Sequence, residues 1–134
     1  MSKERFEDWK VPAIIDGKLT EYNWIVQNKD GLELGYKTDI GAFSYINAKY
    51  GVIIEDYVQI GSHCSIYSIS TIDNKEGLVH LKENSKIGSH STILPGVTIG
   101  KNSIIGAHSL VTTDIEDNVV AFGIPAKIIR KLDE

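Results

Sequence analysis

The sequence lacks the features of a disulfide-stapled, membrane-spanning or nucleic-acid-binding protein. Its 134 residues include a single cysteine, Cys64, so no intramolecular disulfide can form. No apolar run is long enough to cross a bilayer, and no cluster of Lys and Arg stands out in a chain of net charge -4. The first ten residues, MSKERFEDWK, are charged throughout and do not form a signal peptide. We therefore expect one cytoplasmic domain that neither binds nucleic acid nor inserts into a membrane.

What the sequence does have is an aliphatic residue about every six positions, called a rung below. Gly often follows a rung directly, and a small or branched residue stands four positions after it, as Cys64 does after Ile60. Two inward positions in six residues fit a short strand followed by a tight corner, where Gly permits unusual backbone angles. The rungs are Leu34, Ile40, Ile46, Ile54, Ile60, Ile66, Ile72, Leu81, Ile87, Ile93, Ile99, Ile105 and Val111.

This spacing excludes a helix and predicts stacked coils. Each residue of an α-helix is rotated by roughly 100° from the one before, so residues spaced six apart would not lie on one face of a helix. Units that can bury their apolar side only against neighbouring units form a solenoid. Three six-residue sides make one triangular coil, so we predict an all-β, single-stranded parallel β-helix of a little over four coils. Residues 1–33 are expected to form an N-terminal cap, and residues 34–134 the β-helix domain with a C-terminal tail.

The rung spacing breaks twice. The step from Ile46 to Ile54 is eight residues, and the step from Ile72 to Leu81 is nine. Irregular segments on a rigid scaffold commonly carry function. We expect both insertions at the same corner of successive coils, where they would form one lip beside a site.

The four histidines fall into two classes by their position relative to the rungs. His63, His90 and His108 stand three positions after a rung, where asparagines stand elsewhere. Because Asn and His tolerate positive φ, we expect these three to form turns, with His90 and His108 stacked. His80 stands just before Leu81 and should point outward from a strand, so it is the predicted general base. An ordinary exposed histidine explains His80 equally well.

The segment from Lys86 to Arg130, KIGSHSTILPGVTIGKNSIIGAHSLVTTDIEDNVVAFGIPAKIIR, resembles the C-terminal half of hexapeptide-repeat acyltransferases. The galactoside, maltose and serine acetyltransferases are the most similar group, and the resemblance covers roughly residues 34–131. It implies a left-handed β-helix, a homotrimer and acetyl-CoA as co-substrate, with no metal. In that family CoA lies in a groove between subunits, with its phosphates near a basic tail. The positions here that match its contacts are Ser89, Ala107, Thr112, Thr113, Lys127 and Arg130.

The resemblance leaves the acceptor open. Galactoside and maltose enzymes carry their catalytic histidine just before the rung matching Ile72, where this chain has Thr71. Some sugar-nucleotide N-acetyltransferases of this fold place the base in a Val-Asp-His stretch, which matches residues 72–74 with Asn in place of His. The candidate catalytic residues are therefore His80, Asp73, Asn74 and His63.

The missing histidine favours an amine acceptor, because a neutral amine needs less help from a base than a hydroxyl does. We predict N-acetylation of a nucleotide-linked amino sugar for surface polysaccharide, such as the O-antigen of lipopolysaccharide. O-acetylation of a glycoside or polysaccharide sugar is the alternative. Two further readings remain. The γ-class carbonic anhydrases share the fold, although two of their metal-binding histidines are five residues apart and the gaps here are 17, 10 and 18. A non-catalytic scaffold is the other.

Overall fold

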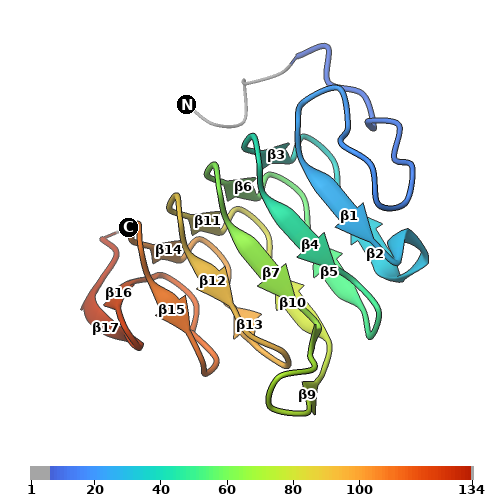
Figure 1. Ribbon diagram of the computed structural model, residues 1–134. Helices are drawn as coiled ribbons and strands as arrows, with labels where there is room; N and C mark the ends of the chain where they lie inside the picture. Colours follow the sequence, from blue (N-terminus) through green and yellow to red (C-terminus); the bar gives the residue numbers. More distant parts are fainter. Residues whose placement is uncertain (1–6, 134) are drawn as a thin grey trace.

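The computed structural model describes residues 7–133 and shows a three-sided solenoid of short parallel strands (Figure 1). The chain passes through three sheets in turn, called faces A, B and C, and then returns to face A one level further along. Strands of successive levels pair in register, so that Ile46 lies opposite Ile66 and Ile54 opposite Leu81. The predicted all-β parallel β-helix is confirmed. Within residues 7–133 no helix is long and apolar enough to span a membrane.

Faces A and B consist of parallel strands only. Face A contains β1 (Ile25–Gln27), β4 (Tyr45–Asn47), β7 (Ser65–Tyr67), β12 (Thr92–Ile93) and β15 (Leu110–Val111). Face B contains β2 (Leu32–Leu34), β5 (Val52–Ile54), β10 (Val79–Leu81) and β13 (Thr98–Ile99).

Face C is parallel except for its last pair of strands. It contains β3 (Asp39–Ile40), β6 (Gln59–Ile60), β11 (Lys86–Ile87), β14 (Ile104–Ile105), β16 (Val119–Gly123) and β17 (Ala126–Lys131). β16 and β17 pair antiparallel and close the C-terminal end of the solenoid. A short 3-10 helix, η2 (Lys29–Gly31), connects face A to face B at the first level.

The solenoid has five levels on face A, more than the predicted number of coils. The additional strand is β1, which lies within the segment 1–33 that we predicted as a cap. Val26 of β1 is fully buried and pairs with Ile46, so regular stacking begins before Leu34. Upstream of β1, the indole N–H of Trp9 donates a 2.9 Å hydrogen bond to the carbonyl of Thr38 and ties the N-terminal segment to the first coil.

All the predicted rungs are buried except Leu34 and Ile72, and Ile72 proves not to be a rung. Leu34, at the first level, is half-buried, whereas Ile72 is 98% exposed. Ile72 lies in the turn of a hairpin formed by β8 (Ile69–Ser70) and β9 (Lys75–Glu76). Ile72 lies six residues after Ile66, and Ser70 is the small residue expected between them. The polar residues that follow Ile72 nevertheless form a turn instead of a corner between two faces. The chain therefore passes from Ile66 directly to Leu81 as the next rung.

Both insertions lie at the corner between faces A and B, as predicted. The first insertion contains Gly51, whose carbonyl accepts a 3.1 Å hydrogen bond from Val79, the residue that ends the second. Ser68 at the start of the second insertion donates from its N–H to the carbonyl of Asn47 at 3.0 Å. The two segments thus stack into one lip, from which the β8–β9 hairpin projects (Figure 1).

The corners are tight for two separate reasons. A Cβ on Gly88 would lie 2.5 Å from the backbone nitrogen of Ala107 on the next level, so glycine is required there for close backbone approach. Our expected reason, unusual backbone angles at this glycine, was wrong. The positive φ occurs two residues after the glycine, at His90 (60°) after Gly88 and at His108 (59°) after Gly106. Asn84 adopts a positive φ (62°) at another corner. The predicted turn-forming role of these histidines is confirmed.

Candidate active site

Ser89 and Ala107, two of the predicted CoA contacts, lie one above the other at the corner between faces C and A. The β16–β17 hairpin covers the end of this corner. A Cβ on Gly106 would lie 2.6 Å from the Phe122 ring, and the Gly123 N–H donates to Ser109 Oγ at 3.0 Å. Lys127 pairs with Phe122 across the hairpin. The C-to-A corner therefore brings small side chains, backbone groups and one cation together.

Lys127 and Arg130 are both exposed on β17, which places two positive charges on the edge of face C. Within residues 7–133 no carboxylate lies within ion-pair distance of either side chain. Their charge is therefore available to an anion such as a phosphate, although Lys127 lacks the planar fork of an arginine. Thr112 and Thr113 follow β15 on the far side of face A and do not join this group.

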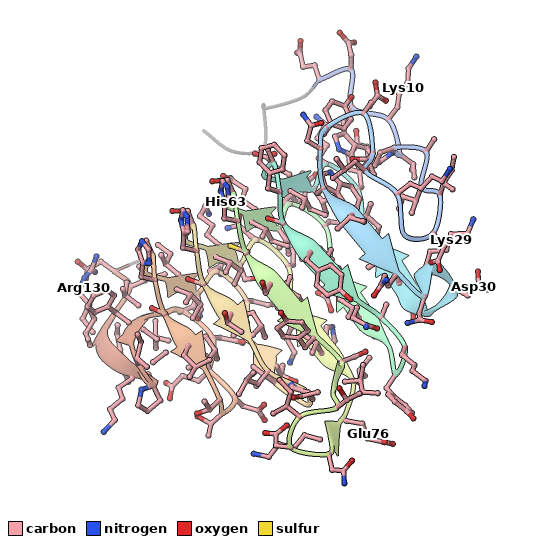
Figure 2. All side chains as sticks on the ribbon, viewed as in Figure 1. Lys10, Lys29, Asp30, His63, Glu76 and Arg130 are labelled. Atoms are coloured by element: carbon pink, nitrogen blue, oxygen red, sulfur yellow. The ribbon has the colours of Figure 1, made fainter. Side chains whose placement is uncertain are left out.

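The three corner histidines form a column beside Ser89 and Ala107. The ring of His63 stacks on His90 with centroids 4.7 Å apart, and His90 stacks on His108 at 4.8 Å. Phe43 continues the column below His63, with its centroid at 5.5 Å. Figure 2 shows this column along one edge of the solenoid, starting at the labelled His63. The predicted stacking of His90 on His108 is confirmed, and His63 joins the same column.

His80 lies on β10 with its side chain outward on face B, between Ile53 and Thr98 of the neighbouring levels. Its Nε2 lies 2.5 Å from Oε2 of Glu55, the residue that follows β5. The other oxygen, Oε1, accepts a 2.9 Å hydrogen bond from the backbone N–H of Glu83. A histidine paired to an anchored carboxylate is a common arrangement for general-base chemistry.

The electrostatics of this pair favour an ionised Glu55. Partial burial by itself raises the pKa of the Glu55 carboxyl. The hydrogen bonds from His80 and from the Glu83 N–H, together with the positive charges of His80 and Lys101, outweigh burial and bring the pKa below its ordinary value of 4.5. Glu55 is therefore a hydrogen-bond acceptor at neutral pH.

Sequence reasoning missed Glu55, although its signal was present. Glu55 follows the rung Ile54, and His80 precedes the rung Leu81 that stacks on Ile54. Counting Ile72 as a rung placed Leu81 on another side of the coil, so the two residues were not recognised as neighbours. With the correct register they are diagonal partners on one sheet face.

Two other predicted catalytic residues, Asp73 and Asn74, lie in the turn of the β8–β9 hairpin. Asn74 has a positive φ of 58°, typical of a turn residue. Asp73 is exposed, with Oδ2 3.9 Å from Nζ of Lys75. The chain continues from this hairpin directly into β10, so Asp73 and Asn74 border the same face as His80.

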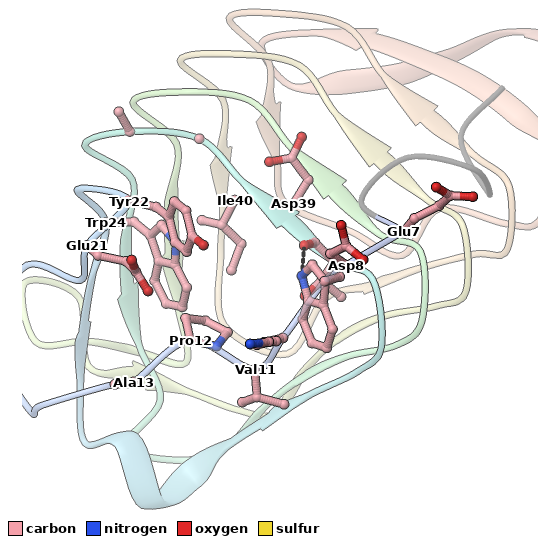
Figure 3. A pocket seen from close by; sticks show the side chains of 15 residues that line it. Glu7, Asp8, Val11, Pro12, Ala13, Glu21, Tyr22, Trp24, Asp39 and Ile40 are labelled. Carbon is pink, nitrogen blue, oxygen red and sulfur yellow. Dashed lines mark hydrogen bonds between the residues drawn. The ribbon is translucent and has the colours of Figure 1, made fainter.

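One chain does not bring all the predicted site residues together. His80 and the hairpin lie on or beside face B, whereas Ser89, Ala107 and the histidine column lie at the C-to-A corner, across the core of the three-sided coil. A hollow of about 1110 Å³ between the N-terminal segment and the first coil contains none of these residues (Figure 3). Within residues 7–133 no three His, Cys, Asp or Glu side chains are grouped to hold a metal ion.

Cys64 is a core residue. It is buried, and its Sγ lies 3.2 Å from the carbonyl oxygen of Gly88. Burial raises the pKa of the Cys64 thiol above 9.0, although nearby backbone hydrogen bonds oppose the shift. This environment does not produce a nucleophilic thiolate.

The stacked six-residue units and their corner residues define a hexapeptide-repeat β-solenoid. A family model described as Bacterial transferase hexapeptide (six repeats) matches residues 79–113. The galactoside O-acetyltransferase of Escherichia coli (strain K12) is 40% identical over 116 residues, covering 75% of this chain and 57% of the relative. These matches confirm the resemblance to hexapeptide-repeat transferases that the sequence predicted. The match spans a little over half the length of the Escherichia coli relative and of the galactoside O-acetyltransferase of Lactococcus lactis.

Solved structures agree with this assignment. A galactoside acetyltransferase in complex with coenzyme A has a TM-score of 0.75 and 29% identity, and the match covers 90% of this chain and 62% of that one. A variant of AntD, an N-acyltransferase from Bacillus cereus, was solved with dTDP-4-amino-4,6-dideoxyglucose and coenzyme A. Its TM-score is 0.60 at 26% identity, covering 84% of this chain and 72% of AntD.

Proposed function

We propose that this protein transfers an acetyl group from acetyl-CoA to a sugar. The observation that carries the proposal is the 40% identity to a galactoside O-acetyltransferase over 75% of the chain. The residues at the C-to-A corner fit the donor. Ser89 and Ala107 leave room for a narrow chain beside the backbone, and the exposed cations Lys127 and Arg130 suit its phosphates.

The active site of this proposal lies between two copies of the chain. His80, Asp73 and Asn74 of one subunit would face the C-to-A corner of the next, with Thr112 and Thr113 at the A-to-B corner of the first. Such a heterologous contact closes into a ring, and a homotrimer is the assembly we propose. His63 of the neighbouring subunit would then approach face B. The reaction would take place in the cytoplasm, where acetyl-CoA is available.

A sugar hydroxyl is the acceptor that we favour. A hydroxyl depends strongly on a general base, and the Glu55–His80 pair supplies a candidate that our sequence prediction of N-acetylation did not include. A nucleotide-linked amino sugar, used for surface polysaccharide, remains the second candidate. The similarity to AntD and the absence of histidine at Thr71 and Asn74 support it.

The first experiment measures acetyl-CoA binding by calorimetry and thiol release against a panel of galactosides, maltose and nucleotide-linked amino sugars. We expect acetyl-CoA-dependent product with a simple glycoside. Product with amino sugars alone would establish the second candidate. Binding of acetyl-CoA without transfer to any sugar, or no binding, would refute the proposed function and leave the scaffold reading.

A mixing experiment tests the shared site. His80→Ala and Lys127→Glu variants are mixed after reversible dissociation and assayed at an acetyl-CoA concentration low enough that each variant alone is nearly inactive. If each site takes His80 from one subunit and Lys127 from its neighbour, random reassembly should restore about a quarter of wild-type activity. If the correctly reassembled mixture stays inactive, His80 and Lys127 do not come from two different subunits to form one site, and the proposed shared site is wrong.

A further inference from the structure

Glu55 is held on both of its carboxylate oxygens. Its backbone N–H donates to the carbonyl of Leu81 at 3.0 Å, so the residue is fixed to β10 on the next level. Oε1 accepts from the Glu83 N–H at 2.9 Å, and Oε2 faces Nε2 of His80 at 2.5 Å. A carboxylate with both oxygens engaged has little freedom to rotate. The position of His80 on face B is therefore defined by an anchored partner.

This contact defines which nitrogen of a neutral His80 carries its proton. An ionised carboxylate can only accept hydrogen bonds, so the short contact requires a hydrogen on Nε2. A neutral imidazole has one N–H, which leaves the lone pair on Nδ1. Within residues 7–133 no hydrogen bond to Nδ1 is present. Nδ1 is thus the atom of His80 that can take a proton.

We propose that Glu55 is a positioning residue that holds His80 in the tautomer with Nδ1 available as the proton acceptor. This inference rests on the proposed acetyl transfer. In the step it serves, the acceptor hydroxyl oxygen bonds to the thioester carbonyl carbon, and Nδ1 takes the hydroxyl proton. The carbon–sulfur bond then breaks, and the proton passes from Nδ1 to the departing sulfur, giving the acetyl ester and free CoA.

The wild-type protein gives the first test, which needs no acceptor and no turnover. Nitrogen-15 NMR of the histidine rings is recorded over a pH series, and the tautomer is read at the alkaline end, where the signals no longer change with pH. The His80 signal is assigned by its loss in His80→Ala. We expect a protonated Nε2 and a bare Nδ1. The opposite tautomer, or an equal mixture of the two, would overturn the proposal.

The Glu55→Gln variant gives the second test. The Glu83 N–H still needs an acceptor, so the carbonyl of the introduced side-chain amide should turn toward it and direct the amide NH₂ at Nε2 of His80. Nε2 would then accept, and the proton would move to Nδ1. We expect the tautomer to invert and kcat to fall roughly 100- to 10,000-fold, with an unchanged KM for acetyl-CoA.

Glu33→Gln is the matched control, because Glu33 lies outward on the same face, one level beyond Ile53, and contacts neither residue of the pair. It should keep wild-type kcat. An equal loss in Glu33→Gln, or a kcat near wild type in folded Glu55→Gln, would overturn the positioning role. A wild-type protein that transfers acetyl to no sugar would instead refute the proposed function. The tautomer measurement would still report whether Glu55 orients His80.

Discussion

Two serines one level apart in the core should respond in opposite directions to the same substitution. Ser85 and Ser103 both point inward at the B-to-C corner and are both fully buried. Ser103 Oγ donates to the Glu116 carbonyl at 2.5 Å and accepts from the Val119 N–H at 3.1 Å. Ser85 Oγ has no hydrogen-bond partner among the described residues. One hydroxyl is fully used and the other is buried without compensation.

The expected magnitudes follow from these contacts. Ser103→Ala removes a hydrogen bond and leaves the buried Val119 N–H unpaired, which should cost about 1–3 kcal/mol. Ser85→Ala removes an unpaired buried hydroxyl and should stabilise the protein by about 1 kcal/mol. Val58 occupies the equivalent position below Ser85, so an apolar side chain is tolerated in this column. The two variants should therefore differ by about 2–4 kcal/mol.

Thermal unfolding followed by circular dichroism measures this difference. One kcal/mol corresponds to about 4 °C in Tm for a domain of this size, so Ser85→Ala should melt above wild type and Ser103→Ala below it. Protein concentration must be equal in all samples because assembly adds to apparent stability. A Ser85→Ala protein as destabilised as Ser103→Ala would refute the assignment of an uncompensated hydroxyl.

Three further predictions test the charge and burial assignments. Lys127→Ala and Arg130→Ala should each raise the KM for acetyl-CoA with little change in kcat, and an unchanged KM in steady-state kinetics would remove their phosphate role. Because burial raises the pKa of the Cys64 thiol, a thiol-specific disulfide reagent should label it at about pH 8 only as fast as the protein unfolds; immediate labelling of folded protein would contradict this. The pKa of Glu55 lies below 4.5 in the folded state, so its carboxylate stabilises the fold above about pH 4.5. This contribution disappears as pH falls through the lower folded-state value, and the stability difference between wild type and Glu55→Gln should shrink in acid; a difference that grows would reverse the sign.

The repeat made the core and the corners predictable. A rung such as Ile93 must be inward because its neighbours on both levels are inward, and a residue three positions later must turn the chain. These constraints are local and recur at every level, so one sequence contains many independent copies of the evidence. The stacking of His90 on His108 at the C-to-A corner followed from the same argument.

The hairpin was not predictable by this reasoning, because a period carries no information about where it stops. Ile72 satisfies the six-residue spacing and is nevertheless exposed at a turn. The error had a chemical consequence. It moved Leu81 to the wrong side of the coil and separated His80 from Glu55, which the structure places in direct contact.

The site itself depends on a constraint that lies outside one chain. Ser89 and His80 are held rigidly by the same solenoid, yet they face away from each other across its core. No internal motion of a stacked β-helix would bring them together without breaking its ladders. If both residues serve one reaction, the second copy must supply the missing side, and assembly then becomes a condition of catalysis rather than an addition to stability.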